Sequence, residues 1–552
     1  MSHADLIVLG RIVTLGTAGD TDRASANPLG VVEAIAIAGG RVIAAGSASD
    51  VEGLAGPRTR RLGVAPDEAV LPGLTDAHLH LADAAVAAIQ LALGSAPTVE
   101  AALEVIGEAS RALADPDAWL RGGGWDAGRW GRWPTASDLD RVAPGRRVAL
   151  WSHDLHAVWA SGAALAAARV TAETPDPPGG LIRRSDDGTP AGVLHEDATG
   201  LVTAHAPVPD GALLEELIGR YARRLLSYGI TAVHDPSELE MDSTLEKGFA
   251  AIERLATAGR LPIRVHAGIR RGALDLAIER GLRSGAPLGP AQGRARVGWL
   301  KLFGDGTLGS RTAALLAPYE DEPGRGEPPG GPTGVYVTSP EEMNLLARRA
   351  AEAGIATQIH AIGDGSLRDA LRALESTAGR TALRARVEHV QLVDRADLPR
   401  FARSRIVASV QPGDLRDDAA RARRAWGARA DASYPWRSLV RSGAVVAFGT
   451  DAPAADDRPW PALAAAITRH DPSWPAGTEW FGGQESLTLD EALQAACVSA
   501  ALAAGEDDRG RLTTGQRADL VVIPAAALRD ADVLRAVGPR LVLVDGAVAF
   551  EA

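Results

Sequence analysis

The stretch VLPGLTDAHLH, residues 70–80, decides the fold and places the first candidate site. It begins as an apolar strand at residues 69–71, breaks at Pro72-Gly73, and ends with His78 and His80. Side chains alternate across a strand, so residues two apart point to the same face. If the strand continues to His80, both imidazoles face one way and one metal ion can bind both. A lone His-x-His pair is a weak signal, so the rest of the chain has to support it.

The composition limits the fold class and the kinds of site that this chain can have. A chain of 552 residues with 46% hydrophobic and 23% charged residues predicts a globular protein of two or more structural units. The net charge of −12 and the absence of a basic run argue against a nucleic-acid partner. Cys497 is the single cysteine, which excludes an internal disulfide and a multi-cysteine metal site.

The sequence also predicts where the protein works. The start, MSHADLIVLGRIVTLG, lacks the basic region and continuous apolar run of a secretory signal. No apolar run reaches the roughly 18–20 residues that a membrane span needs. We therefore expect a cytoplasmic protein without a membrane partner.

Eight short β-branched runs recur along the chain, and most are separated by stretches with helical periodicity. Helical examples are residues 343–353 and 366–377, with apolar residues three and four apart. The predicted strands are 69–71, 230–235, 262–267, 297–303, 355–360, 384–389, 405–411 and 444–451. Alternating strands and helices imply a parallel sheet, and eight such units imply an α/β fold of the (β/α)8 barrel type. A doubly wound open sheet is the alternative, but no GxGxxG turn follows an early strand.

Two parts of the chain fall outside this alternation. Both ends read as strands without helices, which predicts one composite β-sandwich from residues 1–68 and 485–552. The barrel would then occupy residues 69–484. The segment between the first two strands is far longer than a crossover requires, so residues 95–215 are predicted to form an inserted subdomain.

Polar residues stand at the ends of four further strands. Lys301 ends the fourth (WLKLFGDG), His360 the fifth (QIHAIGD), His389 the sixth (VEHVQ) and Asp451 the eighth (GTDAP). In a barrel these ends meet at one rim, where active sites are built. Four imidazoles and a carboxylate suit a Zn²⁺-like ion with open coordination positions.

Lys301 is the exception in this set, because an ammonium has no lone pair for a metal. One interpretation is a structural salt bridge, for example with Asp305. The other is a lysine carbamylated by CO₂, whose carboxylate bridges two metals. The residues alone leave both open.

These motifs together resemble those of the amidohydrolase superfamily. LPGLTDAHLH, LKLFGDGTLGSRTA, IHAIGD, VEHVQ and FGTDAP match in order, as do GGGWDAGRWGRWPTASDLDRVAPGRRVALWSHDLHAVWASGAAL, PGGLIRRSDDGTPAGVLHEDA and GQRADLVV. More narrowly, the chain is similar to the family 3 branch of YtcJ-like hydrolases and N-substituted formamide deformylases. The resemblance covers essentially the whole chain.

The resemblance implies a binuclear metal hydrolase with two divalent ions, expected to be Zn²⁺. His78 and His80 would bind the more buried ion, His360 and His389 the second, N6-carboxylated Lys301 would bridge both, and Asp451 would touch the first. A metal-bound hydroxide would attack an amide-type C–N bond of an N-substituted amide, formamide or N-acyl compound. Asp451 would move the proton from the nucleophile to the leaving nitrogen.

Other readings of the same motifs stay open. Hydrolysis of an ester or lactone would use the same metal site, and some barrel relatives have become non-catalytic scaffolds, although those are expected to lose ligands. Superfamily deaminases typically lack the bridging lysine, which favours amide hydrolysis here. His234 and His266 end the second and third strands, where no ligand is expected. By analogy with the family, the expected partners are a small-molecule substrate and a second copy of the chain in a homodimer.

The tryptophans bear on the substrate. Their positions are Trp119, Trp125, Trp130, Trp133, Trp151 and Trp159 in the insertion, Trp299 in a barrel strand, and Trp426, Trp436, Trp460, Trp474 and Trp480 after the seventh and eighth strands. This distribution favours an apolar pocket and a bulky or aromatic substrate group, although each ring could instead belong to a core. Trp125, His156 and Arg311, in the matched motifs, are candidates for substrate contact; Arg311 could equally be a structural ion-pair partner.

Overall fold

Pro72 and Gly73 mark the point where the chain leaves one sheet and enters another. In the computed structural model, which describes residues 3–16, 29–237, 244–320, 331–474 and 482–552, β5 (Glu68–Pro72) pairs antiparallel with β20 (Leu520–Pro524). The next strand, β6 (Leu74–Asp76), pairs parallel with β13 (Ile230–Asp235). A Cβ on Gly73 would lie 2.5 Å from Thr231, so this close crossing requires glycine.

The prediction that residues 69–71 form the first barrel strand is therefore wrong. The first barrel strand is β6, and the preceding run belongs to the sheet built from the chain ends. A short apolar run has the same pattern in either sheet, so the sequence could not distinguish them.

The predicted (β/α)8 barrel is confirmed. Its parallel sheet runs in the order β19-β18-β17-β16-β15-β14-β13-β6 within the described residues. Besides β6 and β13, its strands are β14 (Arg264–Arg270), β15 (Ala295–Phe303), β16 (Thr357–Ala361), β17 (Arg386–His389), β18 (Val407–Val410) and β19 (Val446–Phe448). The Ala77 amide donates to the Phe448 carbonyl at 2.8 Å, which joins the first strand to the last.

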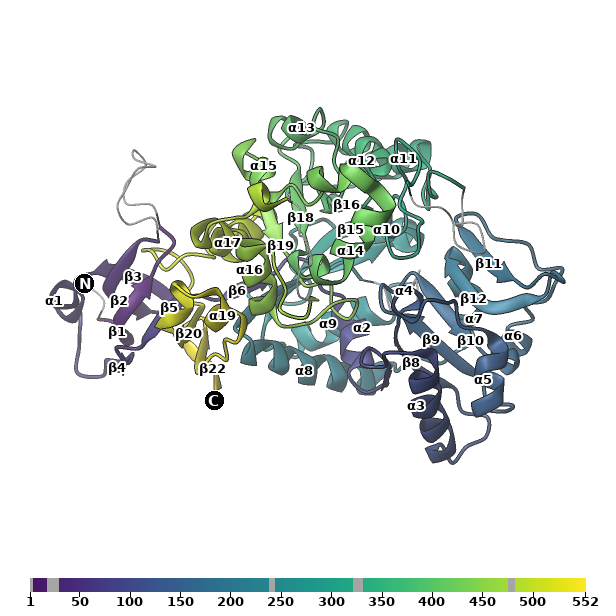
Figure 1. Cartoon of the computed structure of the whole chain (residues 1–552). Coiled ribbons are helices and arrows are strands. Elements are labelled where there is room, and N and C mark those ends of the chain that lie inside the picture. Colours follow the sequence, from purple (N-terminus) through teal and green to yellow (C-terminus); the bar gives the residue numbers. More distant parts are fainter. Residues whose placement is uncertain (1–2, 17–28, 238–243, 321–330, 475–481) are drawn as a thin grey trace.

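Helices surround the barrel strands and cover their outer faces (Figure 1). The helices outside the insertion are α1 (Ala48–Glu52), α2 (Leu81–Ala87), α8 (Gly211–Ser227), α9 (Gly248–Thr257), α10 (Leu274–Glu279), α11 (Pro340–Glu352), α12 (Asp364–Glu375), α13 (Leu398–Arg403), α14 (Leu415–Trp426), α15 (Trp436–Arg441), α16 (Pro459–Thr468), α17 (Leu489–Gln494), α18 (Ala500–Ala503) and α19 (Ala531–Arg535). The start of α11 shows the local cause: Ser339 caps the amide of Glu342, and Pro340 occupies the first turn. Apolar residues of α8, such as Leu217 and Leu225, are buried in the core shared with the barrel strands.

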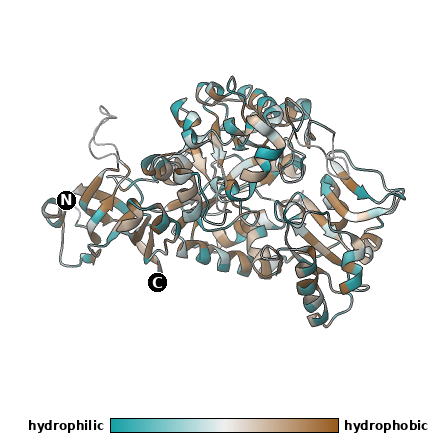
Figure 2. Ribbon diagram, in the orientation of Figure 1, coloured by the Kyte–Doolittle hydropathy of each residue, from teal (hydrophilic) through white to brown (hydrophobic). Residues whose placement is uncertain are grey.

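The two chain ends build one continuous sheet beside the barrel, in the order β22-β21-β20-β5-β1-β2-β3, with β4 paired to β1. Its remaining strands are β1 (Leu6–Val13), β2 (Val31–Ala38), β3 (Arg41–Gly46), β4 (Arg60–Gly63), β21 (Leu541–Val544) and β22 (Ala547–Glu551). Side chains from both ends, including Val8, Ile35, Leu520 and Leu543, share one core. Figure 2 shows apolar stretches along these strands.

The insertion has its own sheet, in the order β11-β12-β10-β9-β8-β7. Its elements are β7 (Leu91–Ala92), α3 (Val99–Ala112), β8 (Leu120–Trp125), α4 (Ala127–Trp130), α5 (Ala136–Val142), β9 (Val148–Ser152), β10 (Ala157–Ala160), α6 (Gly162–Ala167), β11 (Gly180–Arg184), β12 (Pro190–Glu196) and α7 (Gly200–Thr203). In Figure 1 the insertion and the terminal sheet lie on opposite sides of the barrel. Within the described ranges, none of the helices has the length and apolar character needed to span a membrane.

Candidate metal centre

His78, His80 and Asp451 converge at the carboxyl end of the barrel. Asp451 Oδ1 lies 3.2 Å from His78 Nε2 and 3.4 Å from His80 Nε2. One ligand atom from each residue lies within 4.8 Å of the others, a spacing that would allow all three to hold one ion. All three come from loops, because β6 ends at Asp76 and β19 ends at Phe448. The expectation that the two histidines share a strand face is wrong; a turn into α2 brings them together instead.

Asp76 and Thr450 hold the two loops in place. The Asp76 carboxylate accepts hydrogen bonds from the amide of His78 at 3.1 Å and from the amide and hydroxyl of Thr450 at 3.0 and 2.6 Å. A Cβ on Gly449 would lie 2.5 Å from the His78 nitrogen, so the loops touch backbone to backbone. The contact between the first and last strands therefore sets the position of His78 relative to Asp451.

His360, His389 and Lys301 lie beside this trio. The His360 and His389 ring centroids are 4.4 Å apart, and those of His78 and His389 are 5.4 Å apart. The Lys301 ammonium lies 4.5 Å above the Phe303 ring. Burial holds the pKa of His360 well below its usual value, and His389, His156 and Lys301 lower it further. The structure thus brings together all six residues for which the sequence predicts metal ligation.

The backbone is strained at two of these positions. His389 has φ 71° and Asp451 has φ 61°, in the left-handed region that non-glycine residues rarely adopt. Such strain persists where the surrounding structure fixes the residue, and it is often found at functional sites. At both positions the turn directs a side chain toward His78.

The donor set fits a divalent ion. His78 Nδ1 is engaged by Glu388 at 2.6 Å, and His360 Nε2 faces the Gly306 carbonyl at 3.1 Å. The opposite nitrogen of His360, Nδ1, is buried and makes no hydrogen bond within the described part of the chain. Buried polar atoms normally have a partner, so this nitrogen indicates a missing one. In each of these imidazoles one nitrogen has a protein partner, which leaves the other nitrogen for a metal ion. Together with a carboxylate, such imidazoles suit Zn²⁺.

Asp451 is suited to stay ionised in this setting. Burial alone would raise the pKa of its carboxyl. Contacts with His78, His80 and His389 outweigh burial and hold that pKa well below its usual value. The carboxylate therefore stays ionised, as a metal ligand requires.

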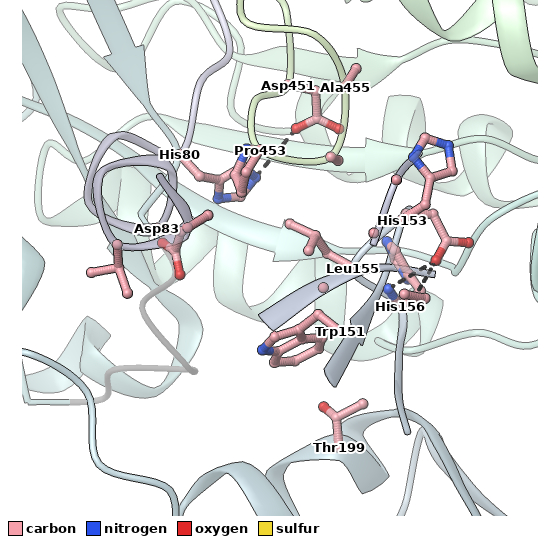
Figure 3. A pocket seen from close by; sticks show the side chains of 18 of the residues that line it. His80, Asp83, Trp151, His153, Leu155, His156, Thr199, Asp451, Pro453 and Ala455 are labelled. Carbon is pink, nitrogen blue, oxygen red and sulfur yellow. Dashed lines mark hydrogen bonds and ion pairs between the residues drawn. The ribbon is translucent and has the colours of Figure 1, made fainter. Parts of the chain in front are cut away.

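A cavity of about 490 Å³ opens onto this centre (Figure 3). Barrel residues and residues of the insertion line it together, among them His80, Trp151, Leu155, His156 and Asp451. The lining also includes many charged groups, among them Asp83, Arg121, Arg129, Arg270, Arg416, Asp417 and Asp456. Apolar and charged side chains therefore share the wall, and the apolar pocket expected from the tryptophans remains a prediction.

His156 is the sequence-predicted substrate contact that does line the cavity. Its Nδ1 lies 2.6 Å from Glu196 Oε2, and the Thr312 hydroxyl donates to Glu196 Oε1 at 2.7 Å. Its ring centroid is 5.2 Å from that of His360. Burial would lower the pKa of His156, but Glu196 and then Asp154 and Asp451 outweigh it and raise this pKa to about 9.

The insertion is fastened to the barrel beside His156. Asp154 accepts hydrogen bonds from the hydroxyls of Thr307 at 2.7 Å and Ser310 at 3.2 Å, both in the loop that follows β15. The Thr312–Glu196 bond joins the same loop to the end of β12. The insertion thereby delivers His156 to the barrel rim in a fixed position.

Trp125 and Arg311 do not line the described cavity. Trp125 is buried in the core of the insertion, where its ring contacts Trp130, Trp133 and Trp159 and its indole donates to Leu150 at 2.7 Å. Among the described tryptophans, Trp151 is the one that lines the cavity; Trp480 lies outside the described residues. Arg311 lies over the Tyr319 ring at 4.6 Å. The structure thus does not support substrate contact for Trp125 or Arg311, because core packing and ring stacking occupy these side chains.

The sequence analysis did not identify the residues that hold the candidate ligands in place. Asp76, Glu196, Arg386 and Glu388 are buried polar residues that touch a candidate site residue or its partner. Two of them stand beside predicted ligands, Asp76 in TDAHLH and Glu388 directly before His389. A carboxylate that close to a histidine ligand was an available signal. Glu196 had no such neighbour in the sequence.

Comparisons with known proteins show the family to which the chain belongs. The family model described as "Amidohydrolase family" matches residues 65–550. YtcJ of Bacillus subtilis (strain 168) is 30% identical over 461 residues, covering 82% of this chain and 83% of the relative. N-substituted formamide deformylase of Arthrobacter pascens is 28% identical over 547 residues, covering 94% and 95%. A crystal structure of an uncharacterized metal-dependent hydrolase from Pyrococcus horikoshii OT3 has 25% identity and a TM-score of 0.73, covering 96% and 99%.

Proposed function

The chain belongs to the amidohydrolase family, and on that premise we propose that it hydrolyses an amide-type C–N bond with the help of two divalent metal ions. The proposed substrates are N-substituted amides, formamides or N-acyl compounds, and the proposed metal is Zn²⁺. The observation that carries this proposal is the convergence of four imidazoles, a lysine and a carboxylate at one end of the barrel, facing a cavity.

Each of these residues has a proposed role. The first ion would be held by His78, His80 and Asp451, the second by His360 and His389, and both by Lys301 once its amine carries CO₂ as a carbamate. The ammonium form of Lys301 has no lone pair and cannot bind a metal ion. If Lys301 only formed a salt bridge, its positive charge would stand among histidines that are proposed to bind cations. The carbamate resolves this conflict, because it replaces the positive charge with a negative one.

A divalent ion bound here would lower the pKa of a water molecule and polarise the carbonyl of the substrate. Asp451 is placed to accept a proton from the attacking water and to deliver it to the leaving nitrogen. His156, fixed through Nδ1 by Glu196, faces the cavity with the rest of its ring and is proposed to orient the substrate.

The cavity supports a substrate larger than a simple formamide. A volume of about 490 Å³ falls in the range of sites that bind drug-sized ligands. Trp151, Phe303 and Leu155 supply apolar wall, and the charged lining can receive polar groups. We therefore propose a substrate with a bulky or aromatic group and additional polar atoms.

The test is a screen of N-formyl and N-acyl arylamides against the matching aryl esters, with the metal-loaded enzyme and with protein treated with a chelator. The proposal expects release of the amine by the loaded enzyme and little release after chelation, restored by Zn²⁺. Hydrolysis of the esters with every amide untouched would overturn the amide assignment. Activity that survives complete metal removal would overturn the metal-dependent mechanism.

A further inference from the structure

Arg386 and Glu388 form an ion pair inside the barrel, and neither is used in the mechanism above. Both side chains are fully buried, at 0% exposure. Arg386 Nε donates to Glu388 Oε1 at 2.5 Å, and Nη2 donates to Oε2 at 3.1 Å. The same Oε2 atom lies 2.6 Å from His78 Nδ1. The pair therefore touches a candidate metal ligand directly.

The Arg386 guanidinium also contacts residues of three other strands and of the loop after β6. Its Nη2 also donates to the Ser409 hydroxyl at 2.7 Å and to the Ala77 carbonyl. Its Nη1 lies 3.1 Å from His234 Nδ1, and its Cζ atom lies 4.7 Å from the Trp299 ring centroid. Contacts from four strands and the loop after β6 thus fix Arg386, and Arg386 in turn fixes the orientation of the Glu388 carboxylate.

Stability alone does not account for such a pair. Removing two charges from water costs several kcal/mol per ion, and replacing a buried pair by apolar residues is often neutral or stabilising. A fully buried, fully bonded pair therefore calls for another role. The contact that stands out is the short one between Glu388 and His78.

A carboxylate that accepts a hydrogen bond from Nδ1 selects one form of the imidazole. Neutral histidine carries a single ring proton, and a charged acceptor at Nδ1 keeps the proton there. The lone pair is then on Nε2, the atom that lies 3.2 Å from Asp451 Oδ1. The pair thus sets both the ring orientation and the nitrogen that is free to ligate.

We propose that the Arg386–Glu388 pair is a positioning device that holds His78 in the Nδ1–H tautomer and presents its Nε2 to a divalent cation. This inference rests on the proposed function, because it assumes that His78 is a ligand. Arg386 and Glu388 are positioning residues that act through His78 and do not touch substrate.

The Arg386–Glu388 pair also explains why a neutral histidine is buried at position 234. His234 Nδ1 can accept a hydrogen bond from Arg386 only while the ring is neutral. Burial holds the pKa of His234 well below its usual value, and His266 and Arg386 lower it further. His234 therefore completes the bonding of Arg386 from the far side, and the chain His78–Glu388–Arg386–His234 runs from the candidate centre into the barrel interior.

The backbone at His389 makes the arrangement possible. Neighbouring residues of a strand point to opposite faces, yet Glu388 bonds to His78 and the His389 ring lies 5.4 Å from the His78 ring. The left-handed φ of 71° at His389 ends the alternation at the tip of β17. One dipeptide thereby supplies a candidate ligand and the carboxylate that orients another.

The experiment compares Zn²⁺ affinity, by competition with a chromophoric chelator, in three proteins. They are the wild type, the double variant Arg386→Met/Glu388→Leu, and the control double variant Arg509→Met/Glu506→Leu. The control removes an ion pair between buried Arg509 and partly buried Glu506, and this pair touches no candidate ligand. Glu388→Gln, close to isosteric, serves as a second test in case the double variant does not fold. Long-range nitrogen NMR of metal-free protein labelled with ¹⁵N-histidine, at alkaline pH, reports the His78 tautomer; His78→Asn identifies its signal.

We expect the Arg386/Glu388 double variant to bind Zn²⁺ about 10–100-fold more weakly than the wild type, with the Arg509/Glu506 control near the wild type. Glu388→Gln should weaken binding in the same direction. The wild-type His78 should carry its proton on Nδ1, and the double variant should show a mixture of tautomers. Equal affinity in all proteins would overturn the inference and leave the proposed function standing.

A wild type that binds no Zn²⁺ would instead overturn the proposed function. The NMR measurement then decides the positioning role by itself: a proton on Nδ1 that is lost in the double variant supports it, and a proton on Nε2 of the wild type refutes it.

Discussion

Asp451 Oδ1 lies 3.2 Å from His78 Nε2, and this contact joins the loop after the last barrel strand to the loop after the first. The Asp451 amide also donates to the His78 carbonyl at 2.7 Å. The contacts that close the barrel therefore also bring His78 and Asp451 together.

Lys301 is expected to carry CO₂ and to bridge two ions. Lys301→Ala should lower the metal content from about two ions per chain to one or fewer, measured by plasma mass spectrometry after purification with bicarbonate. Lys247 is the only other lysine in the chain, so Lys247→Ala is the matched control. With ¹³C-bicarbonate, a carbamate NMR signal should appear in the wild type and the control and be absent from Lys301→Ala. Equal metal content in all three proteins would make Lys301 structural.

Asp451→Asn should separate metal binding from proton transfer. The amide oxygen can still ligate, whereas the amide cannot take up the proton. We expect kcat to fall by about 10²–10⁴-fold with a metal content near that of the wild type, measured on an amide found in the screen. A variant with normal metal content and a kcat near the wild-type value would rule out the proton-transfer role.

Gly449→Ala should disturb the candidate centre through the backbone. The new Cβ would lie 2.5 Å from the His78 nitrogen and 2.6 Å from its Cβ. We expect a loss of about 1–3 kcal/mol in the free energy of unfolding, measured with urea, together with weaker Zn²⁺ binding. Gly63→Ala, where the new Cβ meets nothing within 4 Å, is the control. If both variants behave alike, the close approach of the two loops is not as described.

Trp125 and Trp151 should respond to substitution in different ways. Trp125 is 1% exposed within the insertion core, so Trp125→Ala should cost about 3–5 kcal/mol of stability. Trp151 lines the cavity, so Trp151→Ala should lower kcat/KM for a bulky substrate by about tenfold or more at a smaller cost in stability. Melting and steady-state kinetics on both variants would check this contrast, and the reverse pattern would return Trp125 to the substrate site.

His156 should make the stability of the metal-free protein depend on pH. Its pKa is raised from 6.5 to about 9 in the folded state, so the native protein holds the proton more tightly than the unfolded chain. The resulting stabilisation is complete below about pH 6.5 and is lost as the pH rises through about 9, at most about 3 kcal/mol. Urea unfolding across this range should show the loss in the wild type and in His205→Gln, an exposed control, but not in His156→Gln. An identical pH profile for His156→Gln would contradict the assignment.

The sequence predicted the barrel because its signals are local. Strand and helix periods are read within a few residues, and their alternation implies parallel pairing. The predicted strand 230–235 is β13 to the residue, and the predicted helix 366–377 overlaps α12 at Asp364–Glu375. Strand ends also converge on one rim in any such barrel, so the meeting of His360, His389 and Asp451 followed from their positions in the motifs.

The tertiary structure alone decided which residues hold that set in place and which face the substrate. The run before Pro72 could have joined either sheet, because burial on both faces leaves the same apolar pattern. Trp125 could have faced a pocket or a core, since one large ring satisfies both. The Glu388–His78 and Glu196–His156 bonds depend on where strands distant in sequence meet and on how the backbone turns at their ends. Periodicity carries no information about such contacts, because it reports which face of an element is buried and not which side chain lies opposite.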